Sequence, residues 1–558
     1  MVAAAACCSG LLAQDIDALL ESMSRREKIA QIIFEEIDSK EGPALRAQQE
    51  QWIREGLGGL IVMDDGLVDN IRMVNELQAL ARIPMIVSID GEWGAAMRYY
   101  EYAAFPRAMQ LGALADPALV EAAGRAIGEE LSELKIFVNF APVVDVNNNP
   151  RNPVINTRSF GENPEKVATL GAAYVRGMQG AGVWGSAKHF PGHGDTDVDS
   201  HLGLPVLPFD RARLDSLELY PFRRLIEEGV AMVMVGHLSV PALDPGGTPA
   251  SISKPIVSGL LRDELGYNGI IITDALGMQG VAGSDANAAV EAYKAGADIL
   301  LMPQDTRRTI DELDAAFRRG ELDEAALDAR VRKVLELKRR SGLLDKDYTP
   351  FVDTDSLLEK ASRPQTEALI QTLSDRSMTV VKGKLRRPLK LRGRRHPKVA
   401  YVAFNATTPE SARFEAELRR HGSLVRFDLP GDATPGQIDS VAALLKGFRQ
   451  VIVGIHAGDP VPRSSGPMRM ASIRPEVFEQ MAAWSRSHRL HGCYFGNPYD
   501  LDKLPGFNRF KTFIIGYTDT RFNNVAAARA LTVRGSAQGS LPVGAGGLPA
   551  GWHSNRIR

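Results

Sequence analysis

The sequence predicts an α/β protein in which a TIM (β/α)8 barrel precedes a smaller α/β sandwich domain with a mostly parallel sheet. Between residue 15 and about residue 345, eight short apolar runs alternate with longer amphipathic stretches, a pattern typical of parallel β/α units. Polar residues end most of these runs. A second, shorter β/α series begins near residue 399, and 558 residues exceed one ordinary domain.

The eight runs are rich in β-branched residues, and we expect them to form the barrel strands. They are Gln31–Phe34, Gly59–Met63, Met85–Asp90, Phe137–Asp145, Gly185–Phe190, Ala231–Leu238, Gly269–Asp274 and Ala297–Met302. Stretches with helical periodicity lie between them, such as Pro117–Leu134 and Asn163–Ala181. Eight such units in this length fit a TIM barrel, with a doubly wound sheet as the main alternative.

The polar strand ends favour the barrel over the doubly wound sheet. Polar side chains end the runs at Asp64, Asp65, Asp90, Asp145, Lys188, His189, His237 and Asp274. One such residue is usually a helix cap, but in a β/α barrel all the carboxyl ends of the strands converge on one face, where active sites lie. The sequence therefore predicts one polar site built from residues far apart in the chain.

The second series is expected to form a smaller open sheet with helices between its strands. Its runs are Val399–Phe404, Leu424–Asp428, Val451–Ile455, Gly492–Phe495 and Thr512–Tyr517. We divide the chain into a signal-peptide remnant (1–14), a catalytic barrel (15–350), a linker helix and basic linker (351–397), the sandwich (398–548) and a tail (549–558). The sandwich has neither GxGxxG nor a Walker motif, which argues against a nucleotide.

Composition narrows the classes of partner. Lys and Arg number 66 against 68 Asp and Glu, a net charge of -2, which argues against a nucleic-acid partner. The densest basic run is interpreted as a solvated linker; it comprises Arg386, Arg387, Lys390, Arg392, Arg394 and Arg395. The three cysteines, Cys7, Cys8 and Cys493, have no metal-binding spacing, so we expect neither metal nor other cofactor.

The start of the chain resembles the end of a secretory signal peptide. Residues 2–13 are small and mostly apolar and precede polar Gln14 and Asp15. This pattern favours a periplasmic or otherwise exported protein, with a cytoplasmic protein as the alternative. No stretch reaches the ~20 apolar residues of a membrane-spanning helix. The sequence does not set the oligomeric state.

The richest chemical motif is KHFPGHGDTDVDSH, from Lys188 to His201. It places three histidines, one lysine and three aspartates at a strand end and in the loop after it. Asp199 stands two residues before His201, and a carboxylate hydrogen-bonded to an imidazole raises the basicity of its second nitrogen. Such a histidine can give and take a proton near neutral pH. A metal-binding or merely solvated loop is the alternative.

A second candidate residue is Asp274, which ends the run Gly269–Asp274. A carboxylate at that point faces the ring of strand ends and can attack an anomeric carbon to form a glycosyl-enzyme. The alternative is a helix N-cap.

KHFPGHGDTDVDSH and IITDALGMQGV (271–281) together resemble glycoside hydrolase family 3, and within it the bacterial exo-β-N-acetylglucosaminidases. The resemblance covers most of residues 20–345 and, more weakly, the region to about 545. It implies a TIM barrel, often followed by an α/β sandwich, and a carbohydrate substrate. By matching position, it implies Asp274 as nucleophile, His201 as general acid/base and Asp199 as the partner of His201.

The resemblance also implies a set of sugar-binding residues. Lys188 and His189 match the pair that binds sugar hydroxyls, and Arg158, in NTRSFG, matches an arginine of that site. Asp90 matches the carboxylate that holds the nonreducing sugar, and Arg98, eight residues on, a further binding arginine. The family's DQEGGR is replaced by DGEWGA, with Ala95 where arginine is usual, so subsite contacts and any preference for muropeptides differ or are lost.

The sequence thus predicts a retaining exo-acting hydrolase that releases terminal β-linked N-acetylglucosamine, with peptidoglycan fragments as one candidate source. The alternatives are a β-glucosidase or β-xylosidase of the same family and a β-N-acetylglucosaminide phosphorylase. Two further readings are a metal-dependent hydrolase using His189, His193, His201 and Asp199, and an inactive glycan-binding protein. The exact sugar and aglycone, and the role of the sandwich, are left open.

Overall fold

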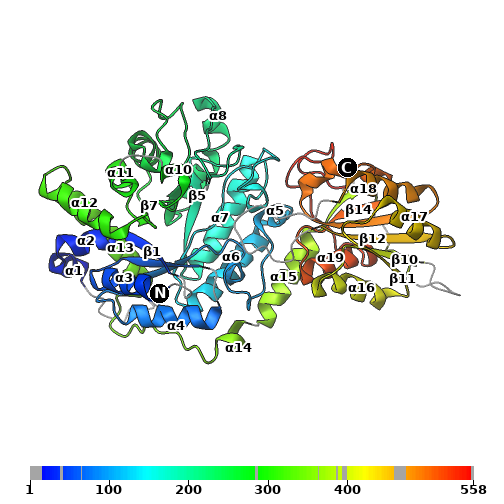
Figure 1. The fold of residues 1–558 in the computed structure, drawn as a ribbon, viewed down its shortest axis with the longest axis horizontal. Helices are drawn as coiled ribbons and strands as arrows, with labels where there is room; N and C mark the ends of the chain where they lie inside the picture. Colours follow the sequence, from blue (N-terminus) through cyan, green and yellow to red (C-terminus); the bar gives the residue numbers. More distant parts are fainter. Residues whose placement is uncertain are drawn as a thin grey trace, which may run out of the picture.

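The computed structural model describes residues 15–37, 42–63, 66–200, 202–282, 287–361, 363–384, 388–391, 399–457 and 473–554. The signal-peptide remnant, Asp64, Asp65 and His201 lie outside the described residues, as does most of the basic run. Two domains lie side by side along the long axis of the molecule, and α15 runs between them (Figure 1).

The first domain is a ring of eight strands, and this confirms the predicted TIM barrel. The strands are β1 (Ile33–Ile37), β2 (Gly59–Val62), β3 (Ile86–Ile89), β4 (Val138–Asn139), β5 (Trp184–Phe190), β6 (Met232–Val235), β7 (Ile270–Thr273) and β8 (Leu300–Leu301). Neighbours pair in parallel in the order β7-β6-β5-β4-β3-β2-β1-β8. A bridge between Ile272 and Ile299 closes the ring. Each predicted run overlaps one strand, although Gln31 ends a helix, β1 continues to Ile37 and β5 begins one residue before its run.

Helices surround the ring, as the amphipathic stretches predict. They are α1 (Ile16–Ser22), α2 (Arg25–Gln31), α3 (Pro43–Arg54), α4 (Leu67–Gln78), α5 (Ala108–Leu111), α6 (Pro117–Glu133), α7 (Pro164–Gly180), α8 (Arg211–Ser216), α9 (Tyr220–Glu227), a π-helix (Pro255–Glu264), α10 (Gln279–Ala282), α11 (Ala288–Ala295), α12 (Thr306–Arg318) and α13 (Glu324–Arg340). Two more, α14 (Leu357–Ala361) and α15 (Pro364–Ser377), lead to the second domain.

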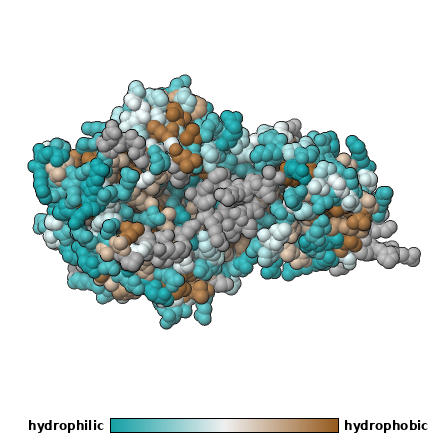
Figure 2. Space-filling view, in the orientation of Figure 1, coloured by the Kyte–Doolittle hydropathy of each residue, from teal (hydrophilic) through white to brown (hydrophobic). Residues whose placement is uncertain are grey.

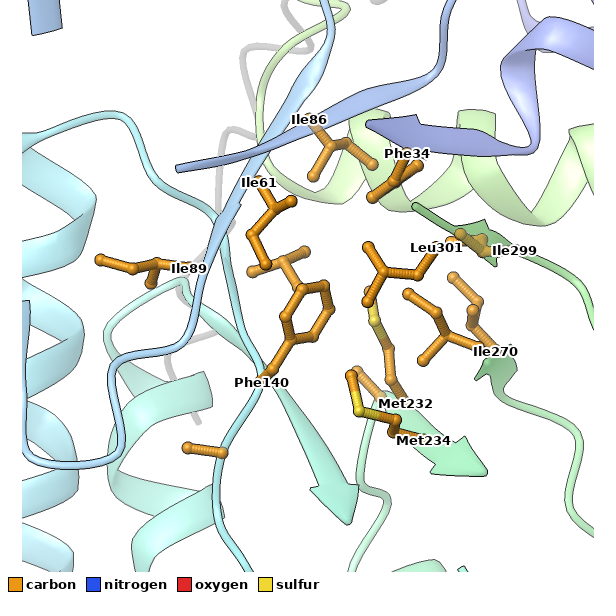
Figure 3. Packing of buried hydrophobic residues seen from close by; sticks show 14 of the residues in the cluster. Phe34, Ile61, Ile86, Ile89, Phe140, Met232, Met234, Ile270, Ile299 and Leu301 are labelled. Carbon is orange, nitrogen blue, oxygen red and sulfur yellow. The ribbon is translucent and has the colours of Figure 1, made fainter. Parts of the chain in front are cut away.

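The barrel interior is filled with large apolar side chains. Figure 3 shows Phe34, Ile61, Met232 and Leu301, from four strands, converging with Phe140, which follows β4, and all five are at most 2% exposed. Burying such side chains is the main driving force for closing the ring. Because the interior is a packed core, the chemistry is confined to the ends of the strands.

The second domain contains a six-stranded sheet, where the sequence predicted five strands. Its strands are β9 (Thr379–Lys382), β10 (Val399–Phe404), β11 (Val425–Leu429), β12 (Gln450–His456), β13 (Arg489–Phe495) and β14 (Thr512–Ile515). Five pair in parallel, in the order β11-β10-β12-β13-β14, and β9 adds to β14 antiparallel. Helices α16 (Pro409–His421), α17 (Pro435–Leu444), α18 (Pro475–Ala482) and α19 (Arg521–Thr532) cover it. The predicted mostly parallel sheet is confirmed.

The extra strand, β9, lies in the range we assigned to linker. Its four residues, TVVK, are too few for periodicity to separate from the end of α15. Pairing with β14 is what makes them a strand.

The two domains are joined by buried polar contacts. Gln110 of the barrel and Asn523 of α19 exchange two hydrogen bonds through their amide side chains, at 2.7 and 2.9 Å. The Tyr499 hydroxyl, which follows β13, donates to the carbonyl oxygen of Asn147 at 2.8 Å. The carboxyl edge of the second sheet therefore faces the barrel.

The surface is mostly hydrophilic, and hydrophobic residues form separate small patches on the face that Figure 2 shows. Within the described residues, no helix combines the length and the apolar character needed to cross a membrane.

Helices α6 and α7 pack unusually closely because glycines form their contact. A methyl group added at Gly177 would lie 2.0 Å from the Glu121 carbonyl oxygen and 2.7 Å from the Arg125 nitrogen. Both helices begin at a proline that follows a capping residue, Asp116 or Asn163, as is common at helix N-termini.

We predict that Gly177→Ala lowers the free energy of unfolding by about 1–3 kcal/mol, the usual cost of overpacking, in chemical denaturation. The control is Gly436→Ala in α17, where the added methyl has no atom within 4 Å. That variant is expected within ~0.5 kcal/mol of wild type. Equal stability of the two variants would contradict the proposed close packing.

Lys338 of α13 is fully buried, and its Nζ donates to Gln31 Oε1 at 2.8 Å. Burial lowers the pKa of Lys338 to about 7. Between this pKa and the usual unfolded value near 10.4, the unfolded chain binds one more proton than the folded one. This group therefore makes the free energy of unfolding rise with pH across that window.

We predict that Lys338→Met removes this contribution. The difference in unfolding free energy between wild type and Lys338→Met should shift in favour of wild type by up to about 2 kcal/mol from pH 7.5 to pH 9.5, measured by urea denaturation. A pH-independent difference would show that the folded amine keeps its proton.

Candidate active site

Strand ends far apart in sequence meet at one end of the barrel. Asp90 follows β3, Lys188 and His189 lie in β5, and Asp274 follows β7. Arg158 ends a short 3-10 helix (Asn156–Arg158) in the β4–α7 connection. The structure thus brings together five of the predicted site residues, and Arg98 joins them through Asp90.

The centre of the site is a chain of alternating buried charges. Lys188 Nζ lies 2.8 Å from Asp90 Oδ1 and 2.9 Å from Glu92 Oε1. Arg98 Nη2 lies 3.1 Å from Asp90 Oδ2, and Arg158 grips Glu92 through Nη2 at 2.7 Å and Nε at 3.0 Å. Each carboxylate thus contacts two cations, which offsets the cost of burying it.

These contacts hold the groups in their charged forms. Burial alone would raise the pKa of Asp90, but Lys188 and Arg98 bring it below its usual value. Arg158 and Lys188 lower the pKa of Glu92 in the same way. Burial opposes the charge of Lys188, yet Asp90 and Glu92 keep its pKa above the usual value. The site therefore presents fixed charges at neutral pH.

Glu92 received no role in the sequence analysis, although it stands two residues after Asp90. It is 9% exposed and is the only described side chain that ion-pairs with both Lys188 and Arg158. The feature of the sequence that could have identified Glu92 is the run Asp90–Gly94, which places two carboxylates beside one strand end.

His189 is oriented by Asp145. Like Glu92, Asp145 was given no specific role in the sequence analysis. Asp145 is fully buried and accepts a hydrogen bond from His189 Nδ1 at 2.8 Å and from the backbone N–H of His193 at 2.7 Å. The other ring nitrogen of His189, Nε2, lies 3.5 Å from Arg158 Nη2. The imidazole is thereby held beside the charge chain.

Asp274 is half-buried at the end of β7, with its backbone N–H donating to the Val235 carbonyl oxygen at 2.9 Å. Its Oδ1 accepts from the Ala275 N–H at 2.8 Å. Burial acts to raise the pKa of Asp274, but His189, His237, this N–H group and Lys188 together lower it to about 2. Asp274 is therefore an ionised carboxylate at neutral pH.

His237, another strand-end residue, holds the backbone beside Asp274. It is fully buried, its Nε2 donates to the Ala275 carbonyl oxygen at 2.9 Å, and its Nδ1 lies 2.7 Å from Ser251 Oγ. A carbonyl oxygen only accepts, so the tautomer with a proton on Nε2 is required. His237 is thus a positioning residue for the segment after β7.

The loop after β5 is anchored by His193. Its Nδ1 lies 2.8 Å from Thr196 Oγ1, and its Nε2 lies 3.2 Å from Ser200 Oγ. Burial, together with the electrostatic effect of neighbouring His189, lowers the pKa of His193 to about 4. His193 is therefore a structural histidine, neutral at pH 7.

The three loop aspartates have different surroundings. Asp195 pairs with Arg213 at 3.0 Å, and Asp197 accepts from Asn149 Nδ2 at 2.8 Å. Asp199 is half-buried, and its carbonyl oxygen accepts from the Leu202 and Gly203 N–H groups. His201 lies outside the described residues. Its neighbour Ser200 accepts a hydrogen bond from the Gly280 N–H at 3.1 Å, six residues after Asp274.

No group of three or more His, Cys, Asp or Glu side chains among the described residues is arranged to hold a metal ion. The structure does not describe His201, one member of the metal-ligand set considered from sequence.

Comparisons with known proteins show the family of the chain. The model of the glycosyl hydrolase family 3 N-terminal domain matches residues 24–337. β-Hexosaminidase A of Pseudoalteromonas piscicida is 37% identical over 351 residues, 56% of this chain and 58% of that enzyme. A β-N-acetylglucosaminidase/β-glucosidase of Cellulomonas fimi is 29% identical over 525 residues, 88% of each chain.

The similarity to solved structures extends over both domains. A family 3 β-N-acetylglucosaminidase from Paenibacillus sp. str. FPU-7 superposes with a TM-score of 0.77 at 31% identity, covering 93% of this chain and 99% of the other. The barrel, its site and these matches lead to one conclusion: the chain belongs to glycoside hydrolase family 3 and is a hydrolase like the β-N-acetylglucosaminidases of that family.

Proposed function

We propose that the protein is a retaining, exo-acting β-N-acetylglucosaminidase that works through a glycosyl-aspartate on Asp274. The observation that carries this proposal is the Asp274 carboxylate, ionised at neutral pH and held at the same barrel end as the Arg98–Asp90–Lys188–Glu92–Arg158 charge chain. A carboxyl group attacks C1 in its deprotonated form, and a carboxyl with a pKa of about 2 is deprotonated at every physiological pH.

The proposed reaction is a double displacement. An Asp274 oxygen attacks C1 of the terminal sugar while the C1–oxygen bond to the leaving group breaks, and His201 gives its proton to that oxygen. His201 then takes a proton from water, whose oxygen attacks C1 and releases Asp274. Asp199 stabilises the imidazolium form of His201, which is present before the first step and is formed again in the second. The protons, bonds and charges of the enzyme return to their starting state.

The charge chain would hold the terminal sugar. Asp90 is 24% exposed at its side chain, whereas Lys188 and Glu92 are almost completely buried, so Asp90 is the member of this group that a ligand reaches most easily. A carboxylate accepts hydrogen bonds from vicinal hydroxyls. The neighbouring cations keep Asp90 ionised and therefore able to accept such bonds. Contacts of this kind stabilise the transition state when they tighten as C1 flattens.

The substrate class follows from the relatives named β-hexosaminidase and β-N-acetylglucosaminidase. We propose terminal β-linked N-acetylglucosamine as the cleaved sugar and peptidoglycan fragments as one source. Ala95 stands where the family usually has an arginine, and Arg98 is the arginine that contacts Asp90 in this chain. This replacement would change the subsite next to the sugar.

The first test is Asp274→Asn, assayed with p-nitrophenyl N-acetyl-β-glucosaminide. Loss of the attacking oxygen charge should lower kcat by at least about 1000-fold, roughly 4 kcal/mol of transition-state stabilisation. The control is Asp347→Asn, an exposed aspartate after α13, which should keep wild-type kcat. Wild-type-like turnover by Asp274→Asn would end the proposed mechanism.

The second test separates the acid role of His201 from a structural one. His201→Ala and Asp199→Asn should slow hydrolysis of chitobiose, whose leaving group needs a proton, at least ~100-fold. Turnover of the p-nitrophenyl substrate should fall much less, because nitrophenolate leaves without protonation. Equal losses on both substrates would argue against proton donation by this loop.

A substrate panel decides between the proposed activity and its alternatives. The p-nitrophenyl β-glycosides of N-acetylglucosamine, glucose and xylose are compared by kcat/KM, with and without added inorganic phosphate. The N-acetylglucosaminide should be preferred, and phosphate should have no effect. Phosphate-stimulated release of a sugar 1-phosphate would instead identify a phosphorylase, and inhibition by EDTA would identify a metal-dependent enzyme.

A further inference from the structure

The second domain has a wide groove at the edge of its sheet that faces away from the barrel. The groove encloses a cavity of about 1370 Å³. It is bordered by the amino ends of β13 and β14 and by the carboxyl end of β9, because β9 runs antiparallel to β14. The opposite edge of the sheet carries the contacts to the barrel made by Tyr499 and Asn523. The groove shares no residue with the active site.

The groove is lined by basic side chains. Exposed cations come from three different places in the chain, namely Lys382, Lys384, Arg489, Arg509 and Lys511. No aspartate or glutamate is among the described residues that line it. Within the part of the chain that the structure describes, the only ion pair of these five cations joins Arg509 to Glu479, at 3.3 Å.

Only one of these five cations has a carboxylate partner among the described residues, which distinguishes the groove from much of the described surface. Elsewhere exposed arginines commonly have partners on neighbouring helices, as Arg176 has in Glu121 and Glu228. Residues 376–409 contain ten Lys or Arg and no Asp or Glu, and Lys382 and Lys384 of this stretch line the groove. Positive charges gathered in a concave surface create a field that attracts a polyanion.

An aromatic ring completes the groove. Trp552 is 37% exposed, and its indole Nε1 donates to the Val381 carbonyl oxygen at 3.0 Å. The backbone N–H of Ser554 donates to the Val380 carbonyl oxygen at 3.0 Å. The segment around Trp552 is therefore fastened to β9. A fixed, exposed indole offers a flat apolar face with a wet rim, which suits the face of a sugar ring.

We propose that this groove binds an anionic polysaccharide, a chain whose sugars carry carboxylates. The cations hold the carboxylates, Trp552 packs against a sugar ring, and the concave shape holds a chain rather than a flat surface. The choice of a glycan rests on the carbohydrate activity proposed for the barrel. Docking a charged glycan on the second domain would raise the local concentration of chain ends at the barrel.

The test uses polygalacturonate, which carries carboxylates but no N-acetylglucosamine, so the barrel has no terminal sugar to bind. Isothermal titration at low salt should show binding to the wild-type protein, no binding of neutral dextran, and weakening as salt rises. The triple variant Lys384→Gln/Arg489→Gln/Lys511→Gln should bind at least ten-fold more weakly. The double variant Lys382→Gln/Lys384→Gln changes only the end of β9, and its affinity for polygalacturonate should fall several-fold. It tests the same groove with fewer changes.

The matched control is Lys254→Gln/Lys346→Gln/Lys360→Gln, which removes the same charge from exposed positions of the barrel domain and of α14. It should bind polygalacturonate like wild type. All variants are also assayed with the p-nitrophenyl substrate, where kcat/KM should be unchanged. A failure of the barrel proposal is thereby visible separately from a failure of the groove proposal.

Three results would overturn the groove proposal. They are wild-type-like binding by the groove triple variant, an equal loss in the control triple variant, and equally tight binding of duplex DNA or of vesicles rich in anionic lipid. The last result would identify the groove as a general polyanion or membrane contact instead of a glycan site.

Discussion

The active site depends on the ion pairs that Lys188 makes with Asp90 and Glu92. Taking an ammonium group out of water is costly, and this lysine is 2% exposed. Two carboxylates within 2.9 Å offset that cost, and each is shared with an arginine, Arg98 or Arg158. Removing any one member would leave an uncompensated charge beside the others. The chain of contacts is therefore a single unit.

This unit joins parts of the barrel that are distant in the sequence. Asp90 and Glu92 come from the β3 end, Lys188 from β5, and Arg158 from the β4–α7 connection. The same charges act on Asp274, because Lys188 and His189 lower its pKa against the effect of burial. The group that we propose to bind sugar and the proposed nucleophile are thus set by one electrostatic arrangement, and a change in one is expected to affect the other.

The second domain supports this arrangement from one side. Tyr499 and Asn147 hydrogen-bond each other, and Asn497 donates to the Asn156 side chain in the turn that carries Arg158. The barrel connection that presents Arg158 is thereby held by residues more than three hundred positions later in the chain. These contacts assign the second domain a structural role at the site, at its carboxyl edge, while its amino edge carries the basic groove.

Much of the fold could be predicted from local pattern alone. The eight apolar runs each overlap a barrel strand, because the β/α alternation repeats often enough to outweigh chance matches. Helices α6 and α7 begin within a residue of the predicted stretches, because Asp116 and Asn163 are capping residues followed by proline. β9 was missed because four residues carry no usable period.

The sequence by itself determined which residue types stand at the strand ends and therefore which side chains could meet. Asp90, Lys188, His189 and Asp274 were all identified there, since the carboxyl ends of parallel strands share one face. Only the tertiary structure decided which of them touch. Glu92 and Asp145 became central because ion pairs and hydrogen bonds act over about 3 Å, and no spacing along the chain specifies such a distance between strands. His193 belongs to the same motif as the candidate acid/base, but it is buried and anchors its loop. Its surroundings, and not its residue type, keep it neutral, because burial lowers its pKa.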